Sequence, residues 1–279
     1  MEAPPVIGSD LPPPTPLIAP WRTLLMGVLM GGYPMAVGMI GVHLRTGAPG
    51  EAALPSTVSG LLLVAAENFG LFALLFLITA AIGRPSRDEL QARGLPGPKA
   101  WALGFGYSVG LRIGIGLVAL VALSAATVVF KIQGRPLDSL AAARPQVENL
   151  LDPSALQNPL YFVLSVSLVS FVVAGLREEL WRAVVFATLL RLIPSWRVTV
   201  KGRLLAVAIA AVIFGLGHLP QGWGGVVLTG ILGAGLGSIL LFHRSLWIAV
   251  LAHGFFDATS FALIRLVDHF GVLDQVLGK

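Results

Sequence analysis

The sequence contains no cysteine and few charged residues, and each shortage excludes a class of protein. Without cysteine, neither a disulfide framework nor thiolate chemistry is available to the chain. Charged residues make up 12% of the sequence, against about 25% in a typical soluble domain. The net charge of +5 is spread over loops without a Lys/Arg block, so we expect no nucleic acid partner.

Hydrophobic residues, by contrast, make up 56% of the 279 residues and gather in long runs. A transmembrane helix needs about 20 apolar residues, whereas a β-barrel would show short alternating segments that this sequence lacks. We therefore predict an all-α fold, a polytopic transmembrane helical bundle of about seven to eight spans. The expected spans are 21–43, 58–83, 100–130, 160–190, 204–219, 225–242 and 246–266, with an eighth if one of the longer runs is two helices.

Composition also divides the chain along its length. Residues 1–20 contain seven prolines and are predicted to form a flexible tail without a core of its own. Residues 21–130 hold the first three spans, and 131–158 is expected to be an extramembrane connection. A second group of spans follows over 159–266, and 267–279 is left as a C-terminal tail.

The distribution of basic residues predicts the orientation of the spans. The loops 84–99 and 191–203 each carry four Lys or Arg residues, and the second has no acid. Both should be cytoplasmic under the positive-inside rule, which also places the N-terminus inside. The connection 131–158 mixes three bases with three acids and should lie outside.

Four charged residues stand together inside the fourth apolar run, at Arg177, Glu178, Glu179 and Arg182. A charged side chain at the bilayer centre costs about 3 kcal/mol on insertion scales, so such residues usually mark a functional site. The alternative is a buried ion-pair network in which Arg177, Arg182 and Arg112 neutralise the two acids. Glu67 and Asn68 in the second run either line a cavity or bond a neighbour, and the sequence does not separate these two roles.

Three further polar residues reach the same level of the membrane from other spans. At about 1.5 Å per residue, Glu178, His218, His253 and Asp257 all lie roughly 13 to 22 Å from the cytoplasmic end of their helices. His253 and Asp257 are four residues apart and therefore share a helix face. Arg112 falls at a similar depth on the third span and is expected to neutralise part of the acid cluster.

These residue types are suited to the activation of water. A carboxylate held between burial and a neighbouring arginine can act as a general base near neutral pH, and either Glu178 or Glu179 is a candidate. A histidine opposite can share the proton of the water, and a His–Asp pair can bind a developing oxyanion. Peptide hydrolysis is the reaction that these groups serve most directly.

At these residues the chain resembles the CAAX-protease and bacteriocin-processing family of intramembrane proteases, which includes the type II CAAX prenyl endopeptidases. That family carries a double glutamate followed by an arginine, then Phe-x-x-x-His, then His-x-x-x-Asn/Asp on successive core helices. The resemblance covers about 159–266. The matching residues are Glu178, Glu179 and Arg182, then Phe214 and His218, then His253 and Asp257.

The resemblance implies that a glutamate and His218 activate water, while His253 with Asp257 stabilises the tetrahedral intermediate without a metal. A divalent metal is the alternative, since His218, His253 and Glu178 together could bind zinc. The His-Glu-x-x-His motif of helical zinc proteases does not occur in the sequence.

One departure from the family pattern concerns the spacing of the first motif. The family usually has three residues between the second glutamate and the arginine, whereas here only Leu180 and Trp181 intervene. Aligning on the acid pair keeps Glu178 as the base. Aligning on Arg182 places Arg177 at the first glutamate and leaves Glu178 as the second, and we adopt the former alignment.

The function that the resemblance implies is that of an intramembrane endopeptidase of the cell (plasma) membrane. Its partners would be the lipid bilayer and a membrane-anchored or lipidated peptide or protein substrate. The alternative is a non-proteolytic relative that acts as a membrane scaffold, an immunity protein or a carrier. A carrier would more often show internal repeats, and we find none in this sequence.

Overall fold

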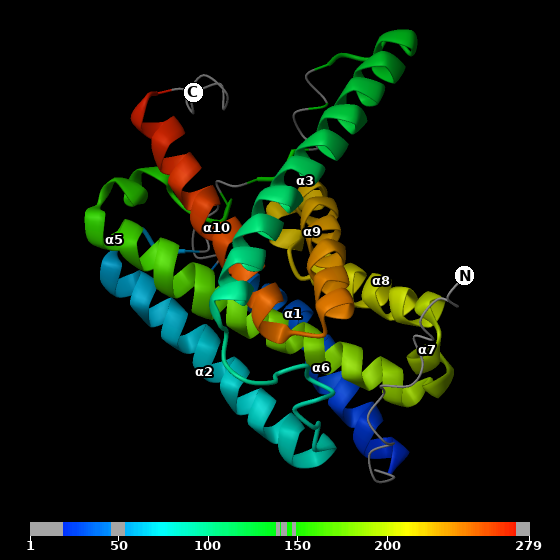
Figure 1. Ribbon diagram of the computed structural model, residues 1–279. Coiled ribbons are helices and arrows are strands. Elements are labelled where there is room, and N and C mark those ends of the chain that lie inside the picture. The colour runs from blue at the N-terminus through cyan, green and yellow to red at the C-terminus, as the bar shows by residue number, and fades with distance from the viewer. Residues whose placement is uncertain (1–18, 46–53, 138–139, 141–143, 147–148, 272–279) are drawn as a thin grey trace.

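The computed structural model describes residues 19–45, 54–137, 140, 144–146 and 149–271, with side chains described up to residue 37 in the first helix. Within these residues the chain forms helices and no strand, which confirms the predicted all-α fold (Figure 1). Of the proline-rich tail predicted for 1–20, residues 1–18 lie outside the described residues, as does most of the predicted C-terminal tail, and Pro20 begins the first helix.

A helix lies at each of the seven predicted spans. The helices are α1 (Pro20–Arg45), α2 (Val58–Gly83), α3 (Pro98–Ile132), α5 (Pro159–Leu164), η3 (Ser165–Leu176), α6 (Arg177–Leu192), α7 (Pro194–Val198), α8 (Val200–Leu216), α9 (Gly222–His243) and α10 (Leu246–His269), with short 3₁₀ turns η2 (Pro153–Gln157) and η4 (Leu219–Gln221). Over the described residues, five helical segments are long and apolar enough to cross a membrane: α2, α3, α5–α6, η4–α9 and α10. The protein is therefore an integral membrane bundle, with α1 and the 17-residue α8 as spans by prediction only.

The fourth span is one continuous helix of 34 residues whose middle part is wider than an α-helix. Ser165–Leu176 form a π-helix, and the hydroxyl of Ser170 donates to the carbonyl of Ser165 five residues earlier at 2.7 Å. π-Helical turns are rare and are frequent at functional sites. This segment ends directly at Arg177, the first residue of the charged cluster, and it packs along α10.

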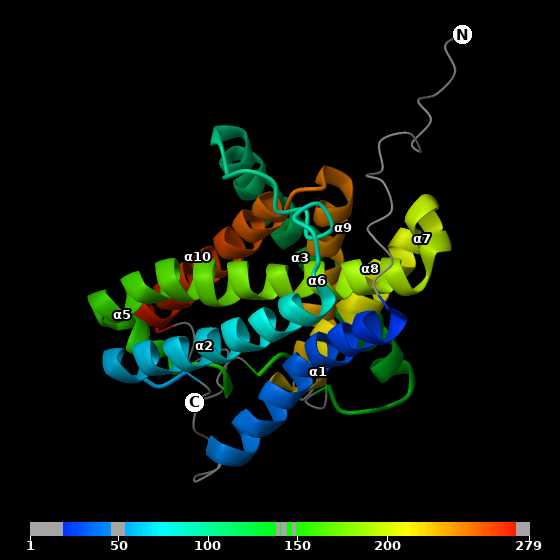
Figure 2. The same cartoon turned by 90° about the horizontal axis from the view of Figure 1, so that it is seen from below.

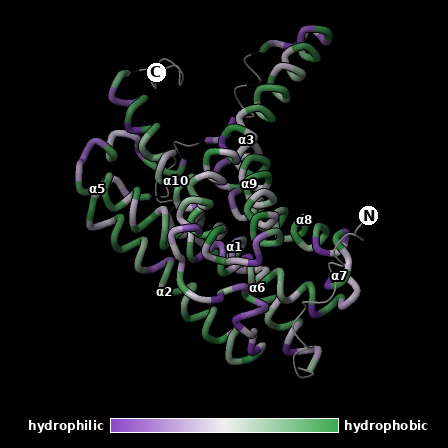
Figure 3. Tube along the Cα trace, in the orientation of Figure 1, coloured by the Kyte–Doolittle hydropathy of each residue, from purple (hydrophilic) through white to green (hydrophobic). Residues whose placement is uncertain are grey.

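The helices α1, α2 and α5–α6 lie side by side, as the two orthogonal views show (Figures 1 and 2). On the other side α10 packs against η3 and α3, while α9 packs against α8. The end of α3 projects from the bundle (Figure 1), and the most apolar part of α3 is not buried by other helices. The Cα trace coloured by hydropathy is hydrophobic along most of its helices (Figure 3), as expected where lipid is the solvent.

Pro34 couples the first helix to the helix of the acid pair. A proline inside a helix has no N–H, so the carbonyl four residues earlier loses its helical partner, and here that carbonyl belongs to Met30. The indole Nε1 of Trp181 donates to this carbonyl at 2.5 Å, and both residues are buried. The hydrogen bond that the proline removes from α1 is thus replaced by one from α6.

Replacing Trp181 with phenylalanine should destabilise the protein by about 1–3 kcal/mol, because the Met30 carbonyl is left buried without a donor. The same substitution in a Pro34→Ala background should cost less, since residue 34 then supplies the N–H within α1. Thermal unfolding of the two single variants and the double variant in detergent measures this coupling. Equal costs for Trp181→Phe in both backgrounds would show that the hydrogen bond does not carry the effect.

An ion-pair network joins the two basic loops that are predicted to be cytoplasmic. Glu89, after α2, accepts from Arg191 at the end of α6 through both carboxylate oxygens, at 2.7 and 2.5 Å. Arg197 approaches the same carboxylate at 3.5 Å, and Ser86 donates to it from its backbone N–H and its hydroxyl. The two loops therefore lie at one end of the bundle, as their shared orientation requires.

This network should make stability depend on pH. Burial by itself raises the pKa of Glu89, but hydrogen bonds from Arg191 and Ser86 outweigh it and lower the pKa from 4.5 to about 2. Because the folded pKa is the lower one, the stabilisation is complete above about pH 4.5 and is lost as the pH falls towards about 2. Thermal unfolding between pH 6 and pH 3 should show a steeper loss for the parent chain than for Glu89→Gln. Asp88→Asn, which removes an exposed pair with Arg93 instead, serves as the control.

Candidate active site

Three helices bring the polar residues singled out in the sequence to one place. Glu178 and Glu179 lie in the first turn of α6, just after the π-helical segment. His218 follows the end of α8 and precedes the η4 turn. His253 and Asp257 lie one turn apart on α10. These residues meet in two adjoining environments, one closed and one open to a cavity.

The closed environment surrounds Glu179, whose side chain is fully buried. Its Oε1 accepts a hydrogen bond from Nδ1 of His253 at 2.8 Å and forms an ion pair with Arg182 three residues on. The guanidinium of Arg182 is 1% exposed and lies over the ring of Phe214 at 4.6 Å. Gly233 makes room for this ring, because a Cβ at position 233 would lie 2.9 Å from Cδ1 of Phe214. Glu179 therefore orients His253 and Arg182 and has no contact with solvent.

Glu178 belongs to the open environment. Its Oε1 accepts from Nη2 of Arg177 at 2.5 Å, while its Oε2 lies 3.7 Å from Nε2 of His253. The side chain is 16% exposed, in contrast to that of Glu179. One oxygen of Glu178 is thus held by an arginine, and the carboxylate faces a cavity.

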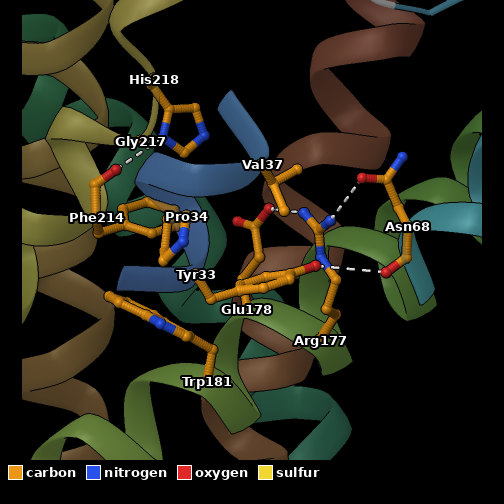
Figure 4. Close-up of a pocket in the computed structure, with 10 residues that line it drawn as sticks. All are labelled: Tyr33, Pro34, Val37, Asn68, Arg177, Glu178, Trp181, Phe214, Gly217 and His218. Atoms are coloured by element: carbon orange, nitrogen blue, oxygen red, sulfur yellow. Dashed lines mark hydrogen bonds and ion pairs between the residues drawn. The ribbon is translucent and has the colours of Figure 1, made fainter. Parts of the chain in front are cut away.

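This cavity has a volume of about 160 Å³ and is lined by both Glu178 and His218 (Figure 4). Nδ1 of His218 is 2.9 Å from the Phe214 carbonyl, which can only accept, so this nitrogen is the donor and Nε2 of the neutral ring is left as an acceptor. The volume is sufficient for several water molecules. The remaining lining residues are Tyr33, Pro34, Val37, Asn68, Arg177, Trp181, Phe214 and Gly217.

The first two helices contribute residues that the sequence motifs did not indicate. Arg177 donates to Oδ1 of Asn68 at 3.5 Å, and the hydroxyl of Tyr33 donates to the Asn68 carbonyl at 3.4 Å. Asn68 is therefore the cavity-lining member of the Glu67–Asn68 pair, whereas Glu67 is exposed. The one signal for this wall in the sequence was polarity inside apolar runs, at Tyr33, Pro34 and Asn68.

Asp257 and Arg112 lie at the edge of the cluster. Oδ2 of Asp257 is 3.6 Å from Nε2 of His253, so the expected His–Asp pair is present. Among the described residues Arg112 forms no ion pair with Glu178 or Glu179, and its charge acts on Asp257 instead, so the expected neutralisation does not extend to the two glutamates. Its Nη2 donates to three acceptors on α10, at 2.6 to 3.0 Å: the Phe256 carbonyl and the hydroxyls of Thr259 and Ser260. The depth of Arg112 along its helix was predictable from the sequence, but the direction of its side chain was not.

The residues do not fit a metal site. Among the described residues, no three His, Asp or Glu side chains are placed to hold an ion. The alternative set His218, His253 and Glu178 is among those that do not come together closely enough. The hydrogen bonds at Nδ1 of the two histidines, to the Phe214 carbonyl and to Glu179, do not bear on this, because a metal would bind at Nε2. The zinc alternative therefore has no support in this geometry.

Comparison with known proteins gives one match. A family model described as type II CAAX prenyl endopeptidase Rce1-like matches residues 159–259. The matched region begins at the first residue of α5 and contains Glu178, His218, His253 and Asp257. No curated protein and no solved structure matches the chain significantly. The resemblance stated from the motifs is thereby confirmed.

Proposed function

We propose that the chain hydrolyses a peptide bond of a membrane-anchored or lipidated substrate in the cell membrane, because residues 159–259 match the type II CAAX prenyl endopeptidase Rce1-like family model. The match to this family model supports the general assignment as a CAAX-type intramembrane protease. The observation that carries the specific mechanism is that Glu178 and His218 line one cavity with room for water, while Glu179 is sealed beside it.

In the proposed mechanism, Glu178 is the general base. Its free oxygen takes a proton from a water molecule in the cavity as the water oxygen attacks the carbonyl carbon of the scissile bond. Nε2 of His218 accepts a hydrogen bond from the same water and orients it. When the tetrahedral intermediate collapses, Glu178 returns the proton to the leaving amine, so the base is regenerated.

His253 is proposed to stabilise the oxyanion of that intermediate. In its doubly protonated form, Nδ1 donates to Glu179 and Nε2–H points to the side of Glu178 and Asp257. A donor held in place before the reaction needs no reorganisation as charge develops on the substrate oxygen. Glu179, itself paired with Arg182, holds the ring at Nδ1, and Asp257 lies 3.6 Å from Nε2, too far to take up this donor as a hydrogen-bond acceptor, so these three act as positioning residues.

The short spacing of the first motif is compatible with this assignment. Aligned on the acid pair, the arginine lies three residues after Glu179, and at that spacing Arg182 forms the ion pair. The other alignment would place Arg177 at the position of the base, and an arginine cannot accept a proton from water. The geometry therefore favours Glu178 as the first family glutamate.

The alternative is a non-proteolytic relative that serves as a scaffold, immunity protein or carrier. Such a protein would need the sealed Glu179–Arg182–His253 cluster for its fold. It would not need an accepting histidine nitrogen and a carboxylate on one cavity with room for water. The alternative therefore predicts that the cavity residues are dispensable for function.

Activity on a prenylated C-terminal peptide in liposomes tests the proposal, with the non-prenylated peptide as a second substrate. Replacing His218 with alanine should lower cleavage by about 100-fold, since loss of the orientation of a reacting group can cost that much. His269→Ala, at the exposed end of α10, is the matched control and should cleave at the parent rate. Cleavage by His218→Ala at the parent rate, in folded protein, would end the protease proposal.

A further inference from the structure

A second cavity, of about 200 Å³, lies on the C-terminal half of α6, away from Glu178. It is enclosed by the turn after α2, by α7, by the first turn of α8 and by the ends of α6 and α9. Its apolar lining includes Phe186, Leu190 and Leu241, and three arginines also line it: Arg197, Arg203 and Arg244. Nothing in the proposed proteolytic mechanism uses this cavity.

The acids that also line the cavity are already engaged. Asp88 pairs with Arg93 at 2.6 Å. Glu89 accepts from Arg191 through both oxygens, with Arg197 at 3.5 Å. The two carboxylates are thus matched by three arginines other than Arg203 and Arg244.

Arg203 and Arg244 remain without an acid partner among the described residues. Arg203 donates from Nε to the carbonyl of Arg197 at 3.0 Å, which leaves its two terminal nitrogens for another acceptor. Arg244 is exposed and caps the end of α9 in a left-handed conformation. Arg203 on α8 and Arg244 after α9 therefore line one cavity, and its three arginines exceed its two acids in number.

The surroundings of the cavity are those of a lipid–water boundary. Val198, the last residue of α7, and Val200, the first residue of α8, are 68% and 56% exposed, and Phe242 at the end of α9 is 79% exposed. Exposed apolar side chains beside arginines are expected where acyl chains meet headgroups. The face is also the one that the basic loops predict to be cytoplasmic, where anionic lipids attract Lys and Arg.

We propose that this cavity binds the phosphate of an anionic glycerophospholipid. The guanidinium groups of Arg203 and Arg244 would hold the phosphate, since arginine binds phosphate oxygens in a bidentate geometry. The apolar lining would cover the glycerol and the upper part of the acyl chains. That lining favours a lipid over free phosphate, which has no apolar part to bury.

Native mass spectrometry of the purified full-length protein in a neutral detergent tests the proposal with phosphatidylglycerol, phosphatidylcholine and inorganic phosphate as probes. The parent protein should bind phosphatidylglycerol at least about tenfold more tightly than phosphatidylcholine. Arg203→Gln combined with Arg244→Asn should weaken phosphatidylglycerol binding about tenfold. A loss of affinity of this size is expected when charge-assisted hydrogen bonds are removed.

Lys131→Gln combined with Arg135→Gln is the matched control, because it removes two exposed cations at the end of α3. It should leave lipid binding within about twofold. Arg244→Asn alone covers the case in which the double variant does not fold, since asparagine tolerates the left-handed conformation, and it should weaken binding about threefold. Unchanged phosphatidylglycerol binding in these variants, or equal binding of phosphatidylcholine, would overturn the proposal. Displacement of the lipid by equimolar inorganic phosphate would overturn the assignment to a lipid.

Discussion

Replacing Glu178 with glutamine should lower the rate of peptide cleavage by about 100-fold or more while the protein still folds and inserts. Glutamine keeps an oxygen that can accept from Arg177, but it cannot take a proton from water. The side chain also lies at a cavity rather than in a sealed core, and Arg177 keeps a hydrogen-bond acceptor although it loses the negative charge, so the protein should still fold. Initial rates in liposomes, normalised to the amount of folded protein, give the measurement.

Glu67→Gln is the matched control for this substitution, because Glu67 is also a carboxylate in a membrane span but is exposed on α2. It should cleave at the parent rate. If Glu178→Gln and Glu67→Gln were equally active, Glu178 would not be the base. A loss of activity accompanied by loss of the folded protein would instead indicate a structural role.

Replacing Glu179 with alanine should, unlike Glu178→Gln, lower the stability of the protein. The expected loss in the free energy of unfolding is about 3–5 kcal/mol, as when one partner of a buried ion pair is removed. The substitution leaves the guanidinium of Arg182 and Nδ1 of His253 buried without their acceptor. Thermal or detergent-induced unfolding, compared directly with Glu178→Gln, measures the difference. Activity should fall as well, since His253 loses the group that orients it.

The double variant Glu179→Leu with Arg182→Met separates the two effects. Exchanging a buried ion pair for apolar residues of similar size is often neutral or stabilising. The double variant should therefore be more stable than Glu179→Ala, while its activity stays low because His253 has no acceptor at Nδ1. Recovery of cleavage together with stability would show that Glu179 has no part in positioning His253.

The spans and the polar cluster were largely predictable because each has a strong local signal. The bounds predicted for the second span, 58–83, coincide with α2. The acids and histidines stood out as costly groups in apolar runs, and spacing by four residues placed His253 with Asp257. Helical rise alone gave their common depth.

The direction of side chains around each helix was less accessible. Arg112 lies at the expected depth but turns to Thr259 and Ser260 on α10. The π-helix before Arg177 changes the direction around the helix axis in which the preceding side chains of this span point. No periodicity in the sequence of Ser165–Leu176 predicts this π-helix. The wall formed by Tyr33 and Asn68 depends on contacts between distant helices, which a motif within one helix does not encode.

The hydrogen bond from the Trp181 indole to the Met30 carbonyl bears on how short a functional version of this protein can be. A fragment trimmed to the family-matched region would retain Glu178, His218 and His253 but would lose α1 and α2. In this fragment the indole of Trp181 would have no hydrogen-bond acceptor, and Arg177 would lose its contact with Asn68. The cavity beside Glu178 would also be open to lipid acyl chains on the side that Tyr33, Pro34 and Asn68 now line. The shortest chain that keeps this cavity closed therefore includes the first two helices, although they carry none of the motif residues.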